Sequence, residues 1–202
     1  MQRRRQAFTL VEVMVSLGVM TIGAMALIAM QQQTTRANVH ARTLTVATQI
    51  AQNVIERLKL EALTWNAVTT SPATDLVNAP SLAKIAAGAT PGEFMTLTPR
   101  FPDTRLLSNA FDYYGADRDL TTGAAAEVAA TYYCASYRLT WIYATFRAMR
   151  VDVRVWWSKE APSRSITTDF PACADNNAKL NPNGTMYDAY HIVYLSTVIR
   201  PL

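Results

Sequence analysis

The chain has 202 residues, of which half are hydrophobic and 17% are charged, so it is too apolar for a disordered chain and can form one ordinary domain with an appendage. Nine prolines and seven glycines exclude a collagen-like or glycine-rich low-complexity protein. The net charge of +4 comes mainly from Arg3, Arg4 and Arg5, since residues 8–202 contain 16 basic and 15 acidic residues. The body is therefore not predicted to bind nucleic acid.

A long uncharged stretch begins near the N-terminus. Residues from Val13 to Met30 carry no charge, and the next charged side chain is Arg36. Eighteen mainly apolar residues are enough for a membrane-spanning helix. The three arginines before this stretch predict an N-terminus in the cytoplasm and a body on the other side. A secretory signal peptide cut near Ala24–Ala26 is the alternative, because this segment weakly fits the small-residue cleavage pattern.

Glu12 lies at the edge of this apolar stretch. A carboxylate at the centre of a bilayer helix costs about 2.5–3.5 kcal/mol on insertion scales, and less near the interface. One explanation is that Glu12 complements the helix dipole in the first turn, which is favourable by about 0.3–1 kcal/mol. The neighbouring residues favour a second explanation, in which Glu12 has a functional role.

The stretch Arg-Arg-Arg-Gln-Ala-Phe-Thr-Leu-Val-Glu-Val, residues 3–13, resembles the class III signal of type IV pilins and pseudopilins. In that family a prepilin peptidase removes a short basic leader on the cytoplasmic side, before a phenylalanine, and methylates the new amine. The resemblance implies cleavage between Ala7 and Phe8, N-methylation of Phe8, and a role for Glu12 as the charge that guides assembly. Ala7 departs from the usual glycine, but it is also small.

One helix is predicted from about Phe8 to Leu63, because no proline occurs before Pro72. It would be about 85 Å long, which exceeds the thickness of a bilayer. Gly18 and Gly23 would allow close approach of another helix in a membrane or a fibre. From Thr43 onward the pattern becomes amphipathic, and the apolar stripe predicted to pack on the head consists of Leu44, Ala47, Ala51, Val54 and Leu58.

The rest of the chain predicts a small antiparallel sheet. Residues 67–92 read as a loop with one short helix at Ser81–Ala87. Strands are predicted at Glu93–Thr98, Tyr137–Tyr143, Met149–Trp157 and Val193–Arg200. In Met149–Trp157 the apolar side chains alternate with Arg150, Asp152 and Arg154, whereas Val193–Arg200 is apolar on both faces, which predicts a central strand. No glycine or proline marks a turn between the second and third strands.

The predicted fold is therefore α+β, with a long N-terminal α-helix packed on a small antiparallel β-sheet head, as the resemblance to pilins also implies. The predicted parts are a leader at 1–7, a transmembrane and assembly half of the helix at 8–35, an amphipathic half at 36–66, and a periplasmic or extracellular head at 67–202.

Cys134 and Cys173 are the two cysteines of the chain. An exported head lies in an oxidising compartment, where such a pair is expected to join, and a loop of this length gives about 3–4 kcal/mol of stabilisation in the chain-entropy model. Two unpaired buried thiols are the alternative. The spacing matches neither a redox motif nor a zinc site. The pair also resembles the disulfide near the C-terminal end of pilin heads.

No catalytic or nucleotide-binding motif is found, so the chain is not predicted to be an enzyme or to hold a cofactor or a metal. His40 and His191 are interpreted as structural. Residues 175–177 with Asn181, Asn183 and Gly184 offer oxygen ligands, but they lack the EF-hand spacing, and turn formation is favoured over calcium binding. Adjacent aromatic residues place Trp156 on the polar strand face, where it either binds a partner or is covered by a loop.

The segments 21–31 and 47–59 resemble those of PilV-type minor pilins, which implies a minor subunit of a type IV pilus. Such a subunit initiates or primes assembly, sits in the pilus tip or fibre, and supports motility and adhesion. Its expected partners are the prepilin peptidase, other minor and major pilins and the inner-membrane assembly platform, with a large tip adhesin as a further candidate. The expected location is the inner membrane and then the surface pilus. The alternatives are a minor pseudopilin of type II secretion and a membrane-tethered enzyme or ligand-binding protein.

Overall fold

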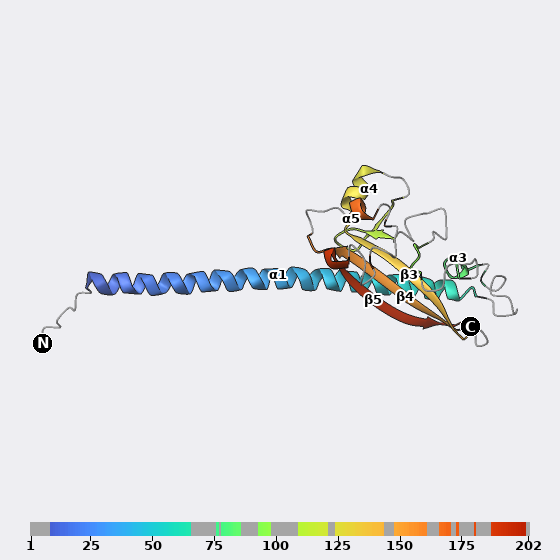
Figure 1. Cartoon of the computed structure of the whole chain (residues 1–202), viewed down its shortest axis with the longest axis horizontal. Helices are drawn as coiled ribbons and strands as arrows, with labels where there is room; N and C mark the ends of the chain where they lie inside the picture. Colours follow the sequence, from blue (N-terminus) through green and yellow to red (C-terminus); the bar gives the residue numbers. More distant parts are fainter. Residues whose placement is uncertain are drawn as a thin grey trace. The chain divides into compact units, whose positions relative to one another are not determined.

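The computed structural model describes residues 9–65, 76, 78–85, 93–97, 109–120, 124–143, 148–160, 166–170, 173, 180 and 187–200. The chain divides into two units, residues 1–43 and 44–202. The predicted fold class is confirmed: the structure combines a long N-terminal helix with a five-stranded antiparallel sheet (Figure 1).

Helix α1 (Leu10–Ala62) has 53 residues and matches the predicted helix to within two residues at each end. Thr9 caps its first turn, because the backbone N–H of Glu12 contacts both the carbonyl oxygen and the Oγ1 of Thr9, at 3.1 and 3.3 Å. At the other end, Thr64 Oγ1 donates to the carbonyl oxygen of Glu61 at 2.7 Å. Threonine side chains therefore form local hydrogen bonds at both ends of the helix.

The sheet has the strand order β2-β1-β3-β4-β5, and all pairs are antiparallel. Its strands are β1 (Ala110–Phe111), β2 (Asp117–Arg118), β3 (Tyr133–Tyr143), β4 (Ala148–Ser158) and β5 (Tyr190–Ile199). In the long strands Val153 lies opposite Tyr137 on one side and Leu195 on the other, with a register shift near the end of β3. Strands β3 and β4 thus form the hairpin for which no turn residue could be found.

The main core lies between one face of the sheet and the second half of α1. Four of the five stripe residues (Ala47, Ala51, Val54 and Leu58) are buried, while Leu44 is exposed. The β4 residues Val151, Val153 and Val155 belong to the same cluster. The amphipathic pattern therefore identified the packing face of α1 correctly from Ala47 onward.

The turn between β1 and β2 contacts α1 closely. A Cβ on Gly115, whose φ is +84°, would lie 3.1 Å from Val46 Cγ1. Arg57 of α1 donates to Asp117 of β2 at 2.7 Å. Burial raises the pKa of Asp117, although the hydrogen bond from Arg57 opposes this increase.

A second hydrophobic cluster covers part of the opposite face of the sheet, where β4 was predicted to be polar. It consists of Ala110, Cys134, Trp156, Ile166, Phe170, Cys173, Leu180 and Tyr190. Trp156 is fully buried, and its ring contacts that of Phe170 at 5.5 Å between centroids. Of the two alternatives for Trp156, cover by another segment is therefore confirmed and exposure to a partner is wrong, because segments that follow β4 cover its ring.

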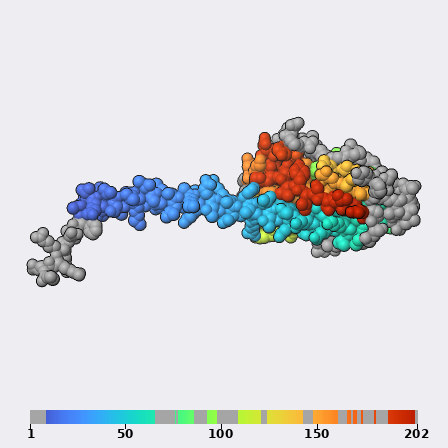
Figure 2. Space-filling view, turned by 90° about the horizontal axis from the view of Figure 1, so that it is seen from below, coloured from blue at the N-terminus to red at the C-terminus, as the bar shows by residue number. Residues whose placement is uncertain are grey.

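The prediction of a central strand at Val193–Arg200 was also wrong. Strand β5 lies at the end of the sheet and pairs with β4, and Tyr194 and Val198 are half exposed. In Figure 2, β5 (red) lies on the surface of the head. One face of β5 packs against the core through Val193 and Leu195, and the other is half exposed. Sequence composition does not distinguish this arrangement from a central strand.

Several short elements differ from the predictions. Helix α3 (Pro80–Ala83) is shorter than the predicted helix, and 86–87 lie outside the described residues. Within 93–97, the described part of the predicted strand Glu93–Thr98, an isolated bridge joins Met95 to Tyr137. Strands β1 and β2 were not predicted, nor were α4 (Ala125–Ala130), α5 (Ile166–Asp169) and the 3-10 helix η3 (Tyr187–Ala189).

Candidate functional site

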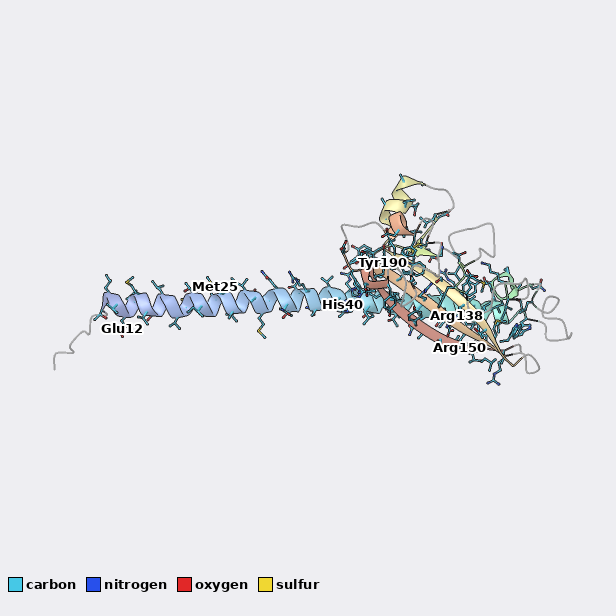
Figure 3. The ribbon with its side chains drawn as sticks, in the orientation of Figure 1. Glu12, Met25, His40, Arg138, Arg150 and Tyr190 are labelled. Atoms are coloured by element: carbon cyan, nitrogen blue, oxygen red, sulfur yellow. A yellow bond between two sulfur atoms is a disulfide. The ribbon has the colours of Figure 1, made fainter. Side chains whose placement is uncertain are left out.

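The first turn of α1 holds the candidate assembly residue. Glu12 is the third residue of the helix after the Thr9 cap, and its side chain is exposed (Figure 3). A threonine followed three residues later by glutamate is the pattern of a capping box, and here the Thr9 half of the box is present. The next charged residue along the chain is Arg36. The predicted cleavage residues Ala7 and Phe8 lie outside the described residues.

The helix after Glu12 is apolar around its whole circumference. Its large hydrophobic side chains are exposed, including Leu17, Val19, Ile22, Met25 and Met30, and Figure 2 shows this segment in blue. Such a helix is long and apolar enough to cross a membrane. A fully apolar surface belongs in lipid or against other apolar helices, since water would disfavour it.

The polar side chains of this segment make hydrogen bonds within the helix itself. Ser16 donates to the Glu12 carbonyl oxygen at 2.7 Å, and Thr21 donates to the Gly18 carbonyl oxygen at 2.8 Å. Thr34 donates in the same way to Met30 at 2.9 Å. These hydroxyl groups therefore need no water, which fits a segment that enters an apolar environment.

Gly18 and Gly23 do not serve packing within the chain. A Cβ at either position would meet nothing within 4 Å. In a water-exposed helix each would cost about 1 kcal/mol relative to alanine. Their small size is useful where a second helix approaches, which supports helix–helix association outside this chain.

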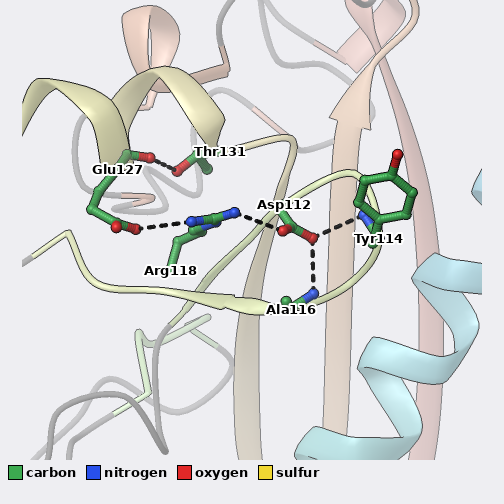
Figure 4. A network of polar contacts seen from close by, with 6 residues as sticks. All are labelled: Asp112, Tyr114, Ala116, Arg118, Glu127 and Thr131. Atoms are coloured by element: carbon green, nitrogen blue, oxygen red, sulfur yellow. Dashed lines mark hydrogen bonds and ion pairs between the residues drawn. The ribbon is translucent and has the colours of Figure 1, made fainter.

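The head contains a polar network around Asp112, shown in Figure 4. Asp112 Oδ1 accepts from the backbone N–H groups of Tyr114 and Ala116 at 2.8 and 2.9 Å, and its Oδ2 accepts from Arg118 at 2.8 Å. Glu127 of α4 lies 3.6 Å from Arg118. Burial alone would raise the pKa of Asp112, but these hydrogen bonds outweigh it and lower the pKa. The network fixes the β1–β2 turn.

A second polar network joins the C-terminal end of α1 to α3. Glu61 is buried, and its two oxygens accept from the backbone N–H and the Oγ of Ser81 at 3.0 and 2.8 Å. The Tyr137 hydroxyl donates to the Ser81 carbonyl oxygen at 2.9 Å. Lys84 donates to the Thr96 carbonyl oxygen at 2.6 Å, and burial lowers the pKa of Lys84 against the opposing effect of Glu61.

Cys134 and Cys173 are joined by a disulfide in the structure. The bond lies in the second hydrophobic cluster, so both cysteines are fully buried. Asn109 donates to the Cys173 carbonyl oxygen at 3.2 Å, which gives the same region a further link to the start of β1. The disulfide therefore ties the segment after α5 to β3.

The remaining candidates from the sequence are His191 and the oxygen-rich loop. The ring of His191 lies 5.3 Å from that of Trp157, in a packed position. The oxygen-rich loop at residues 175–177, 181, 183 and 184 lies outside the described residues. Among the residues that the structure describes, no group of three or more His, Cys, Asp or Glu side chains could hold a metal ion.

Comparison with known families finds one match, and it falls on the segment described first. Residues 2–28 match the model of the prokaryotic N-terminal methylation motif. This match supports a prepilin of the type IV pilin or pseudopilin kind, which is processed by a prepilin peptidase and assembles with other pilins. It covers the leader, Glu12 and most of the apolar stretch, but none of the head. Comparisons with curated proteins and with solved structures find no match.

Proposed function

We propose that the chain is a minor subunit of a type IV pilus, which helps to initiate assembly and sits in the pilus tip or fibre. The observation that carries this proposal is the combination of the methylation motif at residues 2–28 with an uncovered apolar helix. A helix with this surface needs lipid or neighbouring helices. The membrane provides lipid before assembly, and a fibre of pilin subunits provides neighbouring helices afterwards. The resemblance of segments 21–31 and 47–59 to PilV-type minor pilins favours the pilus over type II secretion.

Cleavage between Ala7 and Phe8 would place the assembly charge where a fibre can use it. Glu12 and the new amine of Phe8 are four residues apart, which is one helical turn. The methylated amine remains cationic, so Glu12 can pair with it in the same chain or in a neighbouring subunit. Inside a bundle of helices an unpaired carboxylate is costly, and pairing would therefore select the correct arrangement.

The test compares Glu12→Ala with Glu56→Ala, a change at an exposed glutamate in the second half of the same helix. In cells that assemble pili, Glu12→Ala should still be inserted and cleaved, but its ratio of sheared-fibre to membrane protein should fall at least tenfold. Glu56→Ala should keep the ratio of the unaltered protein. Equal ratios for the two variants would refute the role of Glu12.

The pilus and secretion assignments are separated by deletion of the gene. The pilus proposal predicts a loss of surface pili and of pilus-dependent motility, with protein secretion unchanged. A secretion defect with normal pili would instead identify a minor pseudopilin of type II secretion.

A further inference from the structure

Three strands of the head place polar residues in rows on the face opposite α1. Arg138, Asp152 and Ser196 lie opposite one another on β3, β4 and β5. Arg150 is two residues before Asp152 on β4, so its side chain leaves the same face, opposite Val198 on β5. Figure 3 labels Arg138 and Arg150, which we call the arginine pair, in the same part of the sheet.

A single carboxylate holds the arginine pair. Asp152 Oδ2 accepts from Nε and Nη2 of Arg138 at 3.1 and 2.8 Å, and Oδ1 accepts from Nε of Arg150 at 2.8 Å. Ser196 donates to Oδ1 as well, at 2.5 Å. The side chain of Asp152 is only 4% exposed. Both guanidinium groups are thus fixed in place, but one negative charge balances only one of them.

The outward parts of both guanidinium groups remain accessible. The contacts to Asp152 leave Nη1 of Arg138 and both Nη atoms of Arg150 unused, and these side chains are 34% and 53% exposed. The Arg138 guanidinium also lies over the ring of Phe94, at 4.9 Å from its centroid. Because hydrogen bonds already order the arginine side chains, binding of a ligand would cost little additional side-chain entropy.

A third arginine increases the positive charge beneath this face. Arg154 is fully buried, and its guanidinium lies 3.9 Å from the centroid of the same Phe94 ring. It is hydrogen-bonded to Tyr194 of β5. Arg138, Arg150 and Arg154 therefore lie on the same face of the sheet as Asp152, and Asp152 pairs with the first two.

We propose that Arg138 and Arg150 form a binding site for a carboxylate on an acidic segment of a partner protein. A planar fork of N–H donors matches a carboxylate, which can accept two parallel hydrogen bonds. A protein partner is favoured because Tyr194 and Val198, each 50% exposed, line the same face on the outer strand β5. Arginine and tyrosine beside an apolar surface are the composition of protein interfaces. This site does not depend on cleavage before Phe8 or on Glu12.

The direct test is binding of a fluorescent hexaglutamate peptide to the full chain in nonionic detergent, measured by anisotropy at low salt. Arg3, Arg4 and Arg5 are changed to glutamine in every sample, so that the leader does not bind the peptide. Arg150→Gln should weaken binding at least fivefold and Arg150→Lys less, because lysine keeps the charge but loses the fork. Lys159→Gln removes the same charge from an exposed residue just after β4 and should have no effect. A hexaglutamine peptide should not bind.

Folding and competing anions are controlled in the same samples. Asp152 keeps Arg138 and Ser196 in the Arg150→Gln variant, so its thermal unfolding should match that of Lys159→Gln. Equal peptide affinity for Arg150→Gln and Lys159→Gln would overturn the proposal. It would also be overturned if inorganic phosphate or a sulfated polysaccharide displaced the peptide at lower concentrations than free peptide carboxylates, since the site would then serve a different anion.

Discussion

Glu61 offers a sharp test of how the head is held on the end of α1. Its carboxylate accepts two hydrogen bonds from Ser81, and both residues are buried. Glu61→Ala would leave the backbone N–H and the hydroxyl of Ser81 without their acceptor. Each buried donor that loses its partner costs about 1–3 kcal/mol, so the loss of two should lower the free energy of unfolding by about 2–6 kcal/mol.

Two further variants separate the hydrogen bonds from the effects of helix propensity. Glu61→Gln keeps one acceptor oxygen and the shape of the side chain, so it should cost about half as much as Glu61→Ala. Glu56→Ala makes the same change at an exposed position of the same helix and should stay within about 0.5 kcal/mol of the unaltered chain.

The assay is urea unfolding of the full chain in nonionic detergent, followed by tryptophan fluorescence. All four tryptophans (Trp65, Trp141, Trp156 and Trp157) follow α1, so the signal reports on the head. A Glu61→Ala midpoint equal to that of Glu56→Ala, with unchanged slope, would refute the reasoning. It would mean that Ser81 finds other partners at no cost.

Three other predictions use the same assay. Replacing Cys134 and Cys173 together by serine should lower the free energy of unfolding by about 3–4 kcal/mol, and no change would show that the disulfide does not stabilise the head. Gly115→Ala should cost about 1–2 kcal/mol, because its φ is +84° and Val46 is close, whereas Gly23→Ala should leave the unfolding midpoint unchanged. The pKa values of Asp112 and Asp152 are lowered from 3.8 in the folded chain, so both carboxylates stabilise the fold above about pH 4, and this stabilisation should be lost as the pH falls through their folded-state pKa values. Asp152→Asn should make stability less dependent on pH below about 4, and an identical pH profile would contradict this role.

The long elements of the fold could be predicted where hydrophobic residues recur with a regular period. Helix α1 was predicted almost to its ends, because an uninterrupted apolar stretch and an amphipathic stripe follow each other without a proline. Strands β3 and β4 were predicted in their main parts, since their side chains alternate. These patterns involve only residues that are close in the sequence, so they can be recognised without knowledge of the tertiary contacts.

The elements that the sequence did not predict depend on contacts between residues that are distant in the sequence. Strands β1 and β2 have two residues each and are held by Asp112, Gly115 and the contact to Arg57, none of which a local pattern reveals. The burial of Trp156 and the outer position of β5 depend on which segments cover each face of the sheet. The alternating pattern of β4 showed Arg150 as a polar residue but did not show that Arg138 would join it. The two arginines come together only when β3 pairs with β4.

Of the candidate functional residues, the cysteine pair is joined in the structure as the sequence predicted, whereas the assembly role of Glu12 stays a prediction. The Thr9 cap shows that Glu12 also occupies a position that suits the first turn of any helix. The helix-dipole explanation and the assembly explanation therefore make the same structural prediction. They differ only in what happens to incorporation when the carboxylate is removed.

The central claim is that the chain is a prepilin, and the N-terminus of the mature protein tests it most directly. Mass spectrometry of the protein from membranes that contain a prepilin peptidase should find residues 1–7 removed and a methyl group on the Phe8 amine. The same protein from membranes without the peptidase should retain its leader. An intact N-terminus in the presence of the peptidase, or a cut after Ala26, would contradict the account.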